Sequence, residues 1–440
     1  MPTFRKKPYK FPNSTVRAVF FRLFIFSLFI GTLVTVIAYA RGYRPDIKTR
    51  SITSTGVIAI TSYPQAAKVY INGTLKGVTN LNLTLPPGEY KVELKKEGYT
   101  EWENKVTLKG EIVMTLDGLL FPKNPSLSPL TSLGVTKAIP IGQTDKLILI
   151  SKNNNLEKDG LYIFEMNKRP LSLLPPLKPL LLIKNLPKNA QIDNVKVSFS
   201  PDYQQGIFDF KTDEDYTVSY LMSLNEENIQ LFDITTSKDT LLDAWKEQKN
   251  KEISKILETF PKEITKVASD SIRVVSFSPD ETKMLYQVST PLALPAAITP
   301  PLIGSNQTAE ERNLQTNRLY IYDRKEDKNF AVNDLKLPST TPPLSRDQAT
   351  LSVIPTIPNL LLTGDIYNSI LWYPDSRHLT IKEKENIIII DYDGKNKRTI
   401  YSGPFDEAFF NVNNEGKLLI LTNLNPQNNQ SSDLYAVGIK

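Results

Sequence analysis

The sequence predicts one N-terminal transmembrane helix and an all-β exterior, made of a small β-sandwich and a degenerate β-propeller. Three observations lead to this fold class. An uncharged apolar run of 18 residues extends from Leu23 to Ala40, residues 56–117 alternate apolar and polar side chains, and a six-residue motif recurs in the remainder. A run of that length indicates a membrane span, alternation indicates half-buried strands, and a recurring motif indicates a repeat fold.

The apolar run is long enough to cross a bilayer, which requires about 20 residues. Basic residues flank it, six before and four after: Arg5, Lys6, Lys7, Lys10, Arg17 and Arg22, then Arg41, Arg44, Lys48 and Arg50. The positive-inside rule then favours a cytoplasmic N-terminus. We therefore expect a cytoplasmic stub over residues 1–17, a span over 18–40 whose partner is the lipid bilayer, and a connector over 41–55. The bulk of the chain is then extracellular.

A cleaved signal peptide is the alternative for this segment. Residues 38–40 (Ala-Tyr-Ala) have the small-x-small form of a cleavage site. The apolar core is longer than the ~7–15 residues of a typical signal peptide, and Arg41 would become the first mature residue. These two points favour an anchor, and cleavage after Ala40 stays open.

Composition argues against most catalytic chemistry. The chain has no cysteine and one histidine, His378. Disulfides, thiolate sites and multi-histidine metal sites are therefore excluded, and any serine triad would need His378, which we expect at an exposed turn. No Gly-x-Ser-x-Gly elbow is present. We expect a protein that is not an enzyme, with no catalytic residue, metal or cofactor.

The net charge of +6 lies partly in the segments that flank the apolar run. Basic residues beside a membrane span contact lipid headgroups and set topology. The remaining exterior is nearly balanced, so we expect no nucleic-acid partner.

Residues 56–117 predict a sandwich of five or six short strands. Four segments alternate and end in turn residues: Val57–Ser62, Ala67–Gly73, Leu81–Gly88 and Glu89–Gly98. Asn72-Gly73 is a strong signal for a two-residue hairpin turn, because both turn positions require a positive φ.

This region resembles the PEGA domain, a β-sandwich module of bacterial and archaeal surface proteins. The residues that carry the resemblance are Ser62–Ala67 (SYPQAA), Val69–Gly73 (VYING), Leu85–Tyr90 (LPPGEY) and Gly98-Tyr99. The eponymous Pro-Glu-Gly-Ala stands here as Pro-Gln-Ala-Ala. The resemblance implies a surface or cell-envelope module, often proposed to bind other envelope components, and it implies no chemistry.

Residues 131–440 carry the repeat that predicts a β-propeller of five to seven blades. The motif Val-Ser-Phe-Ser-Pro-Asp occupies residues 197–202 and 275–280, with a weaker copy at 370–375. A second mark, an apolar segment that ends in aspartate, follows each copy at 229–233, 319–323 and 387–391. Two further strand pairs lack the motif, so five units are visible. The pattern resembles the blades of TolB-like and WD-repeat-like propellers, and an irregular β-sandwich is the alternative.

Segments of different composition interrupt this pattern. Three prolines predict a semi-rigid linker over residues 118–130. Apolar side chains at helical spacing predict an inserted helix over residues 239–260. Proline-rich residues 291–316 and 338–360 predict mobile loops, and residues 170–187, apolar but rich in proline, predict a strap between blades.

Two acidic segments have structural explanations. Residues 391–394 (Asp-Tyr-Asp-Gly) begin like a calcium loop, but the twelfth position is Ser402 and the flanks are strands, so a hairpin turn is favoured. Residues 213–215 (Asp-Glu-Asp) are typical of a solvated loop.

The sequence thus predicts a membrane-anchored cell-envelope protein that binds or scaffolds without catalysis. We expect an envelope glycan or a surface protein as its ligand, with Tyr99 and Trp102 as candidate contacts that could stack on a sugar ring. The alternative is an exported hydrolase of wall polysaccharide with a propeller active site.

Overall fold

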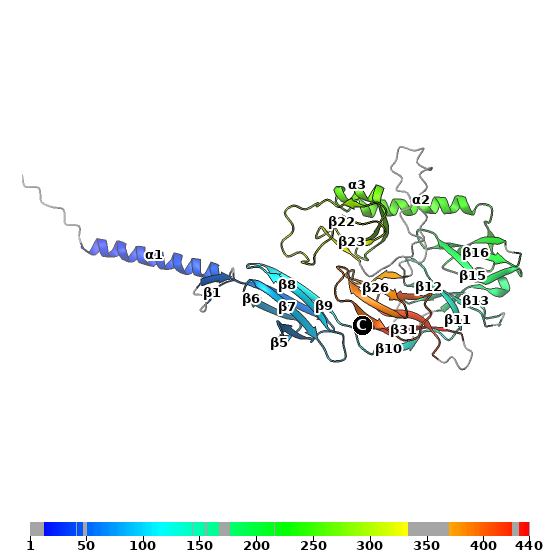
Figure 1. The fold of residues 1–440 in the computed structure, drawn as a ribbon, viewed down its shortest axis with the longest axis horizontal. Coiled ribbons are helices and arrows are strands. Elements are labelled where there is room, and N and C mark those ends of the chain that lie inside the picture. Colours follow the sequence, from blue (N-terminus) through cyan, green and yellow to red (C-terminus); the bar gives the residue numbers. More distant parts are fainter. Residues whose placement is uncertain are drawn as a thin grey trace, which may run out of the picture. The chain divides into compact units, whose positions relative to one another are not determined.

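The computed structural model describes residues 13–40, 42–46, 51–142, 144–153, 155, 157–166, 177–214, 216–332, 369–424 and 431–439. The chain divides into two compact units (Figure 1). One comprises Met1–Lys96 and Glu101–Leu119, and the other comprises Glu97–Thr100 and Leu120–Lys440.

The first unit begins with the apolar helix α1 (Asn13–Ala40). Val16–Ala40, 25 residues, is long and apolar enough to cross a membrane, and none of it is buried within the protein. The hairpin of β1 (Tyr43–Asp46) and β2 (Ser51–Ser54) follows the helix. The predicted connector over 41–55 therefore contains paired strands.

Two sheets form the sandwich of the first unit. The strands are β3 (Gly56–Tyr63), β4 (Lys68–Ile71), β5 (Thr74–Val78), β6 (Leu81–Leu85), β7 (Gly88–Lys95), β8 (Trp102–Leu108) and β9 (Val113–Leu119). Their orders are β6-β3-β9 and β5-β4-β7-β8, and β3 pairs with β9 in parallel. Asn72 and Gly73 have φ of 49° and 78°, which confirms the predicted hairpin turn.

The second unit contains five four-stranded antiparallel sheets, which we call blades 1–5. Blade 1 is β11 (Val135–Pro140), β12 (Lys146–Ser151), β13 (Gly160–Glu165) and β14 (Leu177–Leu182); blade 2 is β15 (Ala190–Phe199), β16 (Gln205–Thr212), β17 (Thr217–Ser223) and β18 (Phe232–Asp233); blade 3 is β19 (Ile272–Phe277), β20 (Lys283–Val288), β23 (Leu319–Asp323) and β24 (Lys328–Ala331); blade 4 is β25 (Ile370–Trp372), β26 (His378–Glu383), β27 (Asn386–Asp391) and β28 (Arg398–Tyr401); blade 5 is β29 (Phe410–Val412), β30 (Leu418–Thr422), β31 (Asp433–Gly438) and β10 (Ser126–Pro129).

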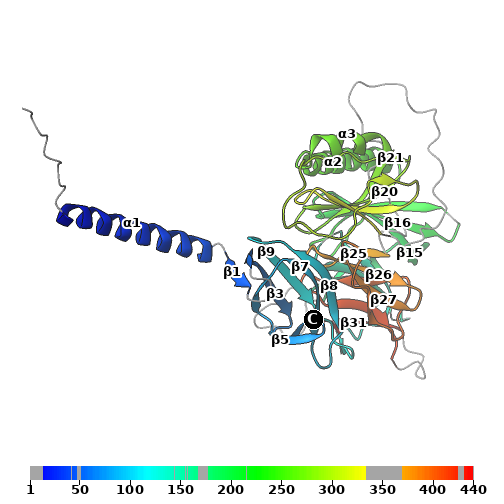
Figure 2. The ribbon, with the colours of Figure 1, turned by 60° about the vertical axis from the view of Figure 1, so that its left-hand side comes forward.

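The blades pack as a ring, which confirms the predicted propeller. Blade 1 shares one apolar core with blade 2 and another with blade 5, and blades 3 and 4 share a third. The Tyr373 hydroxyl of blade 4 donates to the carbonyl of Gly416 in blade 5 at 3.1 Å. Helix α2 (Lys238–Leu257) bridges blades 2 and 3 and lies beside α3 (Lys262–Ser271) (Figures 1 and 2).

In blades 1 to 4, the strand that comes first in the sequence is the innermost one. Lys137 Nζ on β11 contacts the carbonyl of Val195 on β15 at 3.5 Å, and the indole Nε1 of Trp372 on β25 donates to Ser276 Oγ on β19 at 3.1 Å. First strands of neighbouring blades therefore lie side by side, which requires them to surround the axis of the ring.

The strand at the start of the propeller, β10, closes the ring. β10 pairs with β31, the strand nearest the C-terminus, as the fourth strand of blade 5. The predicted linker over residues 118–130 is therefore wrong: β9 ends at Leu119, Phe121 is 1 % exposed, and residues 126–129 belong to the propeller.

The Ser-Pro-Asp turns form as predicted, and the aspartates of the second marks end strands at different positions in the blades. Ser200 Oγ donates to Asp202 at 2.6 Å, and Ser278 Oγ donates to Asp280 at 2.7 Å. Asp323 and Asp391 end third strands, whereas Asp233 ends the fourth strand of blade 2.

The inserted segments are more regular than the sequence suggests. The predicted helix over 239–260 is α2, and α3 follows it after Pro261. Residues 291–316, expected to be a mobile loop, contain paired β21 (Leu292–Ala293) and β22 (Asn313–Leu314) and bind blade 4 through Asn306 Nδ2 and Asp393 at 2.9 Å. β14 occupies part of the predicted strap at 170–187. Residues 338–360 lie outside the described residues.

Candidate functional site

A cation–carboxylate pair recurs at one end of three blades. The first residue of the second strand faces the last residue of the third strand across the ladder. The nitrogen–oxygen distances are 3.9 Å for Lys146–Glu165, 3.4 Å for Lys283–Asp323 and 3.1 Å for His378–Asp391. Uncharged Gln205 and Ser223 occupy the same positions in blade 2. The register of the strands places the two members of each pair opposite each other.

His378 is buried, so the predicted exposed turn is wrong. It is 5 % exposed, its Nδ1 lies 2.7 Å from Asp375 Oδ2, and its Nε2 lies 3.1 Å from Asp391 Oδ1. Burial by itself lowers the pKa of His378, but the hydrogen bonds and charges of Asp375 and Asp391 outweigh it and raise the pKa to about 9. An imidazole that holds both protons at neutral pH cannot act as a general base. The His378 imidazole instead bridges the carboxylates of Asp375 and Asp391.

Phe121 packs on this pair from outside the blade. Its ring lies 6.4 Å from the His378 ring and 6.2 Å from the Tyr373 ring, both edge-to-face. The segment that leads from the sandwich into the propeller is therefore held at blade 4 by an aromatic contact.

Acidic residues of both segments form hydrogen bonds or ion pairs within the fold. Asp391 accepts a bond from Asn396 Nδ2 at 2.8 Å as well as pairing with His378, and Gly394 has a φ of 82° in the predicted Asp-Gly turn. Asp213 accepts a bond from Gln191 Nε2 at 3.0 Å, and Asp215 lies outside the described residues. No group of histidine, aspartate and glutamate suited to a metal occurs among the residues that the structure describes.

Of the two predicted ligand contacts, one is contradicted. Trp102 is 5 % exposed and packs in the sandwich core beside Gly118, so its ring is not available to stack on a sugar. Its position at the start of β8 directs the side chain inward. Tyr99 is half-buried and forms an isolated bridge with Pro122, and its role as a contact stays a prediction.

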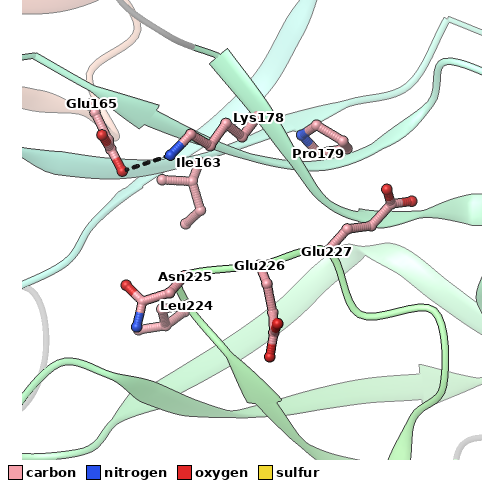
Figure 3. A pocket seen from close by; sticks show the side chains of 8 residues that line it. All are labelled: Ile163, Glu165, Lys178, Pro179, Leu224, Asn225, Glu226 and Glu227. Carbon is pink, nitrogen blue, oxygen red and sulfur yellow. Dashed lines mark hydrogen bonds and ion pairs between the residues drawn. The ribbon is translucent and has the colours of Figure 1, made fainter.

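A cavity of 230 Å³ opens between blades 1 and 2, and Figure 3 shows its two walls. Glu165, Lys178 and Pro179 stand on the blade 1 side, and Leu224–Glu227 stand on the blade 2 side. Glu165 is already bound to Lys178 at 3.5 Å. The cavity is smaller than the ~300–1,000 Å³ of typical ligand sites.

The innermost strands carry three basic residues that belong to none of the sequence motifs: Lys137 on β11, Lys196 on β15 and Arg273 on β19. The sequence contains a signal for two of these residues, because Lys196 and Arg273 each stand a few residues before a Ser-Pro-Asp motif. Its meaning depends on knowing that these strands line the axis of the ring.

Comparison with known protein families matches residues 55–124 to the PEGA domain. The sandwich is a PEGA domain. The matched range extends past β9 to the segment that contains Phe121. A search of curated proteins finds no match.

Among solved structures, the chain is similar to several propellers at low identity. A putative TolB from Agrobacterium tumefaciens is 10% identical, with 77% of this chain and 89% of that chain covered and a TM-score of 0.16. The propeller domain of the Trilobed protease from Pyrococcus furiosus is 10% identical, with 88% and 96% covered and a TM-score of 0.21. A putative 6-phosphogluconolactonase from Bacteroides fragilis is 12% identical, with 81% and 86% covered and a TM-score of 0.18. The propeller assignment rests on the five sheets and the closing strand.

Proposed function

We propose that this chain is a single-pass membrane protein of the cell envelope that binds or scaffolds other envelope components without catalysis. Its N-terminus lies in the cytoplasm, and the PEGA domain and propeller lie outside. The observation that carries the proposal is α1, an apolar helix with a 25-residue span of which no part is buried in the protein. Lipid is the environment that covers such a surface at lowest free energy.

Two features support a binding role, and two others argue against catalysis. A PEGA domain adjoins the helix, and a propeller offers a rigid ring whose loops and inner strands can present contacts. The buried His378 is committed to two carboxylates, and the cavity between blades 1 and 2 is small. The hydrolase alternative requires two carboxylates about 5–9.5 Å apart around a substrate cleft.

The absence of cysteine makes the topology directly measurable. Single variants Thr3→Cys and Lys76→Cys place one thiol in the N-terminal stub and one on the exposed β5 strand of the PEGA domain. In intact cells we expect a membrane-impermeant maleimide to label Lys76→Cys only, and in inverted vesicles to label Thr3→Cys only. The unmodified chain is the control, since it has no thiol to react.

Labelling of Thr3→Cys in intact cells would reverse the proposed orientation. A mature chain whose mass begins at Arg41 would show that α1 is removed, and would make this a secreted protein. Catalysis has a separate measurement: new reducing ends released from purified wall polysaccharide by the full chain would favour the hydrolase.

A further inference from the structure

We propose that the inner edge of the propeller binds an anionic glycan through Lys137, Lys196 and Arg273. The proposal rests on the envelope-binding function above and names the ligand class and the surface for it. The three residues come from the first strands of three consecutive blades.

Topology directs these side chains to the axis of the ring. A first strand is covered by neighbouring blades on both faces and by the second strand on its outer edge, so it meets solvent mainly at the axis. Lys137 is the third residue of β11 and Lys196 the seventh of β15, and both are exposed in mid-strand. Arg273, the second residue of β19, is half-buried.

No carboxylate neutralises the three cations within the described part of the chain. Lys137 Nζ makes one long contact, 3.5 Å to the carbonyl of Val195, and Lys196 is the next residue along that strand. The buried Nε of Arg273 has no hydrogen-bond partner.

The acid opposite Lys196 and the acid on its own strand both have other partners. Asp209, which faces Lys196 across the ladder, is 2.6 Å from Lys238 Nζ and accepts a bond from Ser219 Oγ at 2.7 Å. Asp193, the acid on β15, pairs with Lys152.

An oxyanion supplies the negative charge and the hydrogen-bond acceptors that this surface lacks. An anion near several cations of one sign reduces their mutual repulsion, and a guanidinium N–H without a partner lacks the energy of a charge-assisted hydrogen bond. Carboxylate and phosphate groups match a guanidinium fork in geometry and an ammonium in charge. Cations on three separate strands suit a chain that carries several such groups.

The uncharged residues on the first strands of the blades favour a glycan over an acidic protein. Thr136, Asn194, Ser276 and Asn411 provide hydroxyl and amide groups, and Trp372 lies half-buried beside Ser276. None of the exposed large apolar residues of the described chain lies on a first strand. A protein ligand depends on apolar and aromatic anchors, whereas hydroxyl-rich sugars pair with polar groups.

Calorimetry of the full chain in detergent micelles tests the proposal. The probes are hexagalacturonate, neutral maltohexaose of the same length, a hexaglutamate peptide and inorganic phosphate. We expect hexagalacturonate to bind most tightly and to lose affinity as salt rises. The double variant Lys137→Gln and Lys196→Gln should weaken it about tenfold, as expected for the loss of two charge pairs.

The matched control, Lys255→Gln with Lys262→Gln, removes two exposed charges from α2 and α3 and should leave the affinity unchanged. Lys196→Gln alone is the second test variant, because that side chain makes no bond in the described structure and its loss should not lower the thermal midpoint. An unchanged affinity in both test variants overturns the proposal, as does equal binding of maltohexaose or no binding of any probe.

Two other results also overturn it. Hexaglutamate binding as tightly as hexagalacturonate would indicate an acidic protein ligand, and phosphate alone binding would indicate a site for the free ion. None of these outcomes changes the thiol-labelling result, so the failure of this proposal is distinguishable from failure of the membrane-anchored function.

Discussion

Replacing His378 with alanine is expected to lower the free energy of unfolding by about 3 kcal/mol, because it leaves two partly buried carboxylates facing each other without a cation. The His378 side chain is 7% exposed and bonds to Asp375 at 2.7 Å and Asp391 at 3.1 Å. Denaturant unfolding of the full chain in detergent, followed by the near-ultraviolet signal, measures the loss.

Lys146→Ala is the matched control for this variant. Lys146 occupies the same position in blade 1, but its contact with Glu165 is longer, 3.9 Å, and its side chain is 29% exposed. A partly exposed pair contributes up to about 1 kcal/mol. Equal losses of unfolding free energy in the two variants would show that burial of the His378 pair does not increase its contribution to stability.

The same pair predicts a pH dependence. The pKa of His378 is raised from 6.5 to about 9 in the folded protein, so folding is favoured by proton binding. The stabilisation is fully present below pH 6.5 and is lost as the pH rises from about 6.5 to 9. We expect the difference in unfolding free energy between the unmodified chain and His378→Ala to shrink over this range, and a constant difference would contradict the prediction.

A disulfide across the closing strand is expected to stabilise the propeller by about 2–4 kcal/mol. Ser128 of β10 faces Ala436 of β31 in the antiparallel ladder, so cysteines at both positions lie at a separation that a disulfide can bridge. The bond would close a loop of about 300 residues, and restricting a long loop removes much entropy from the unfolded chain. Thermal unfolding of the oxidised double variant should occur several degrees higher.

Reduction of the same double variant is the internal control, because no other thiol is present in the chain. The reduced form and Ser128→Cys alone should unfold like the unmodified chain. An oxidised form that is no more stable than the reduced form would show that β10 does not limit the opening of the ring.

Local patterns were sufficient for the elements whose signal is local. The apolar run predicts α1, the alternation in residues 56–117 predicts the sandwich, and Asn72-Gly73 predicts its hairpin turn. The Ser-Pro-Asp motif predicts blades because each copy sits at the turn between the first two strands of a blade. Such features depend on the order of neighbouring residues along the chain.

Burial depends on partners that are distant in sequence. His378 follows a turn, where exposure is the usual outcome, and it is covered by Phe121 from the other end of the propeller domain. Trp102 carries the ring expected of a sugar contact, but the sandwich core encloses it. For neither residue does the local sequence pattern predict burial.

The sequence by itself determined the long apolar helix, the PEGA domain and the repeat of the propeller, since each follows from periodicity and short motifs. Only the tertiary structure decided that residues 126–129 close the ring, because their partner strand lies at the opposite end of the chain. It also decided that Lys137, Lys196 and Arg273 lie on the first strands of three consecutive blades. Closing a ring pairs strands that are far apart in sequence, and no local pattern predicts which strands will pair.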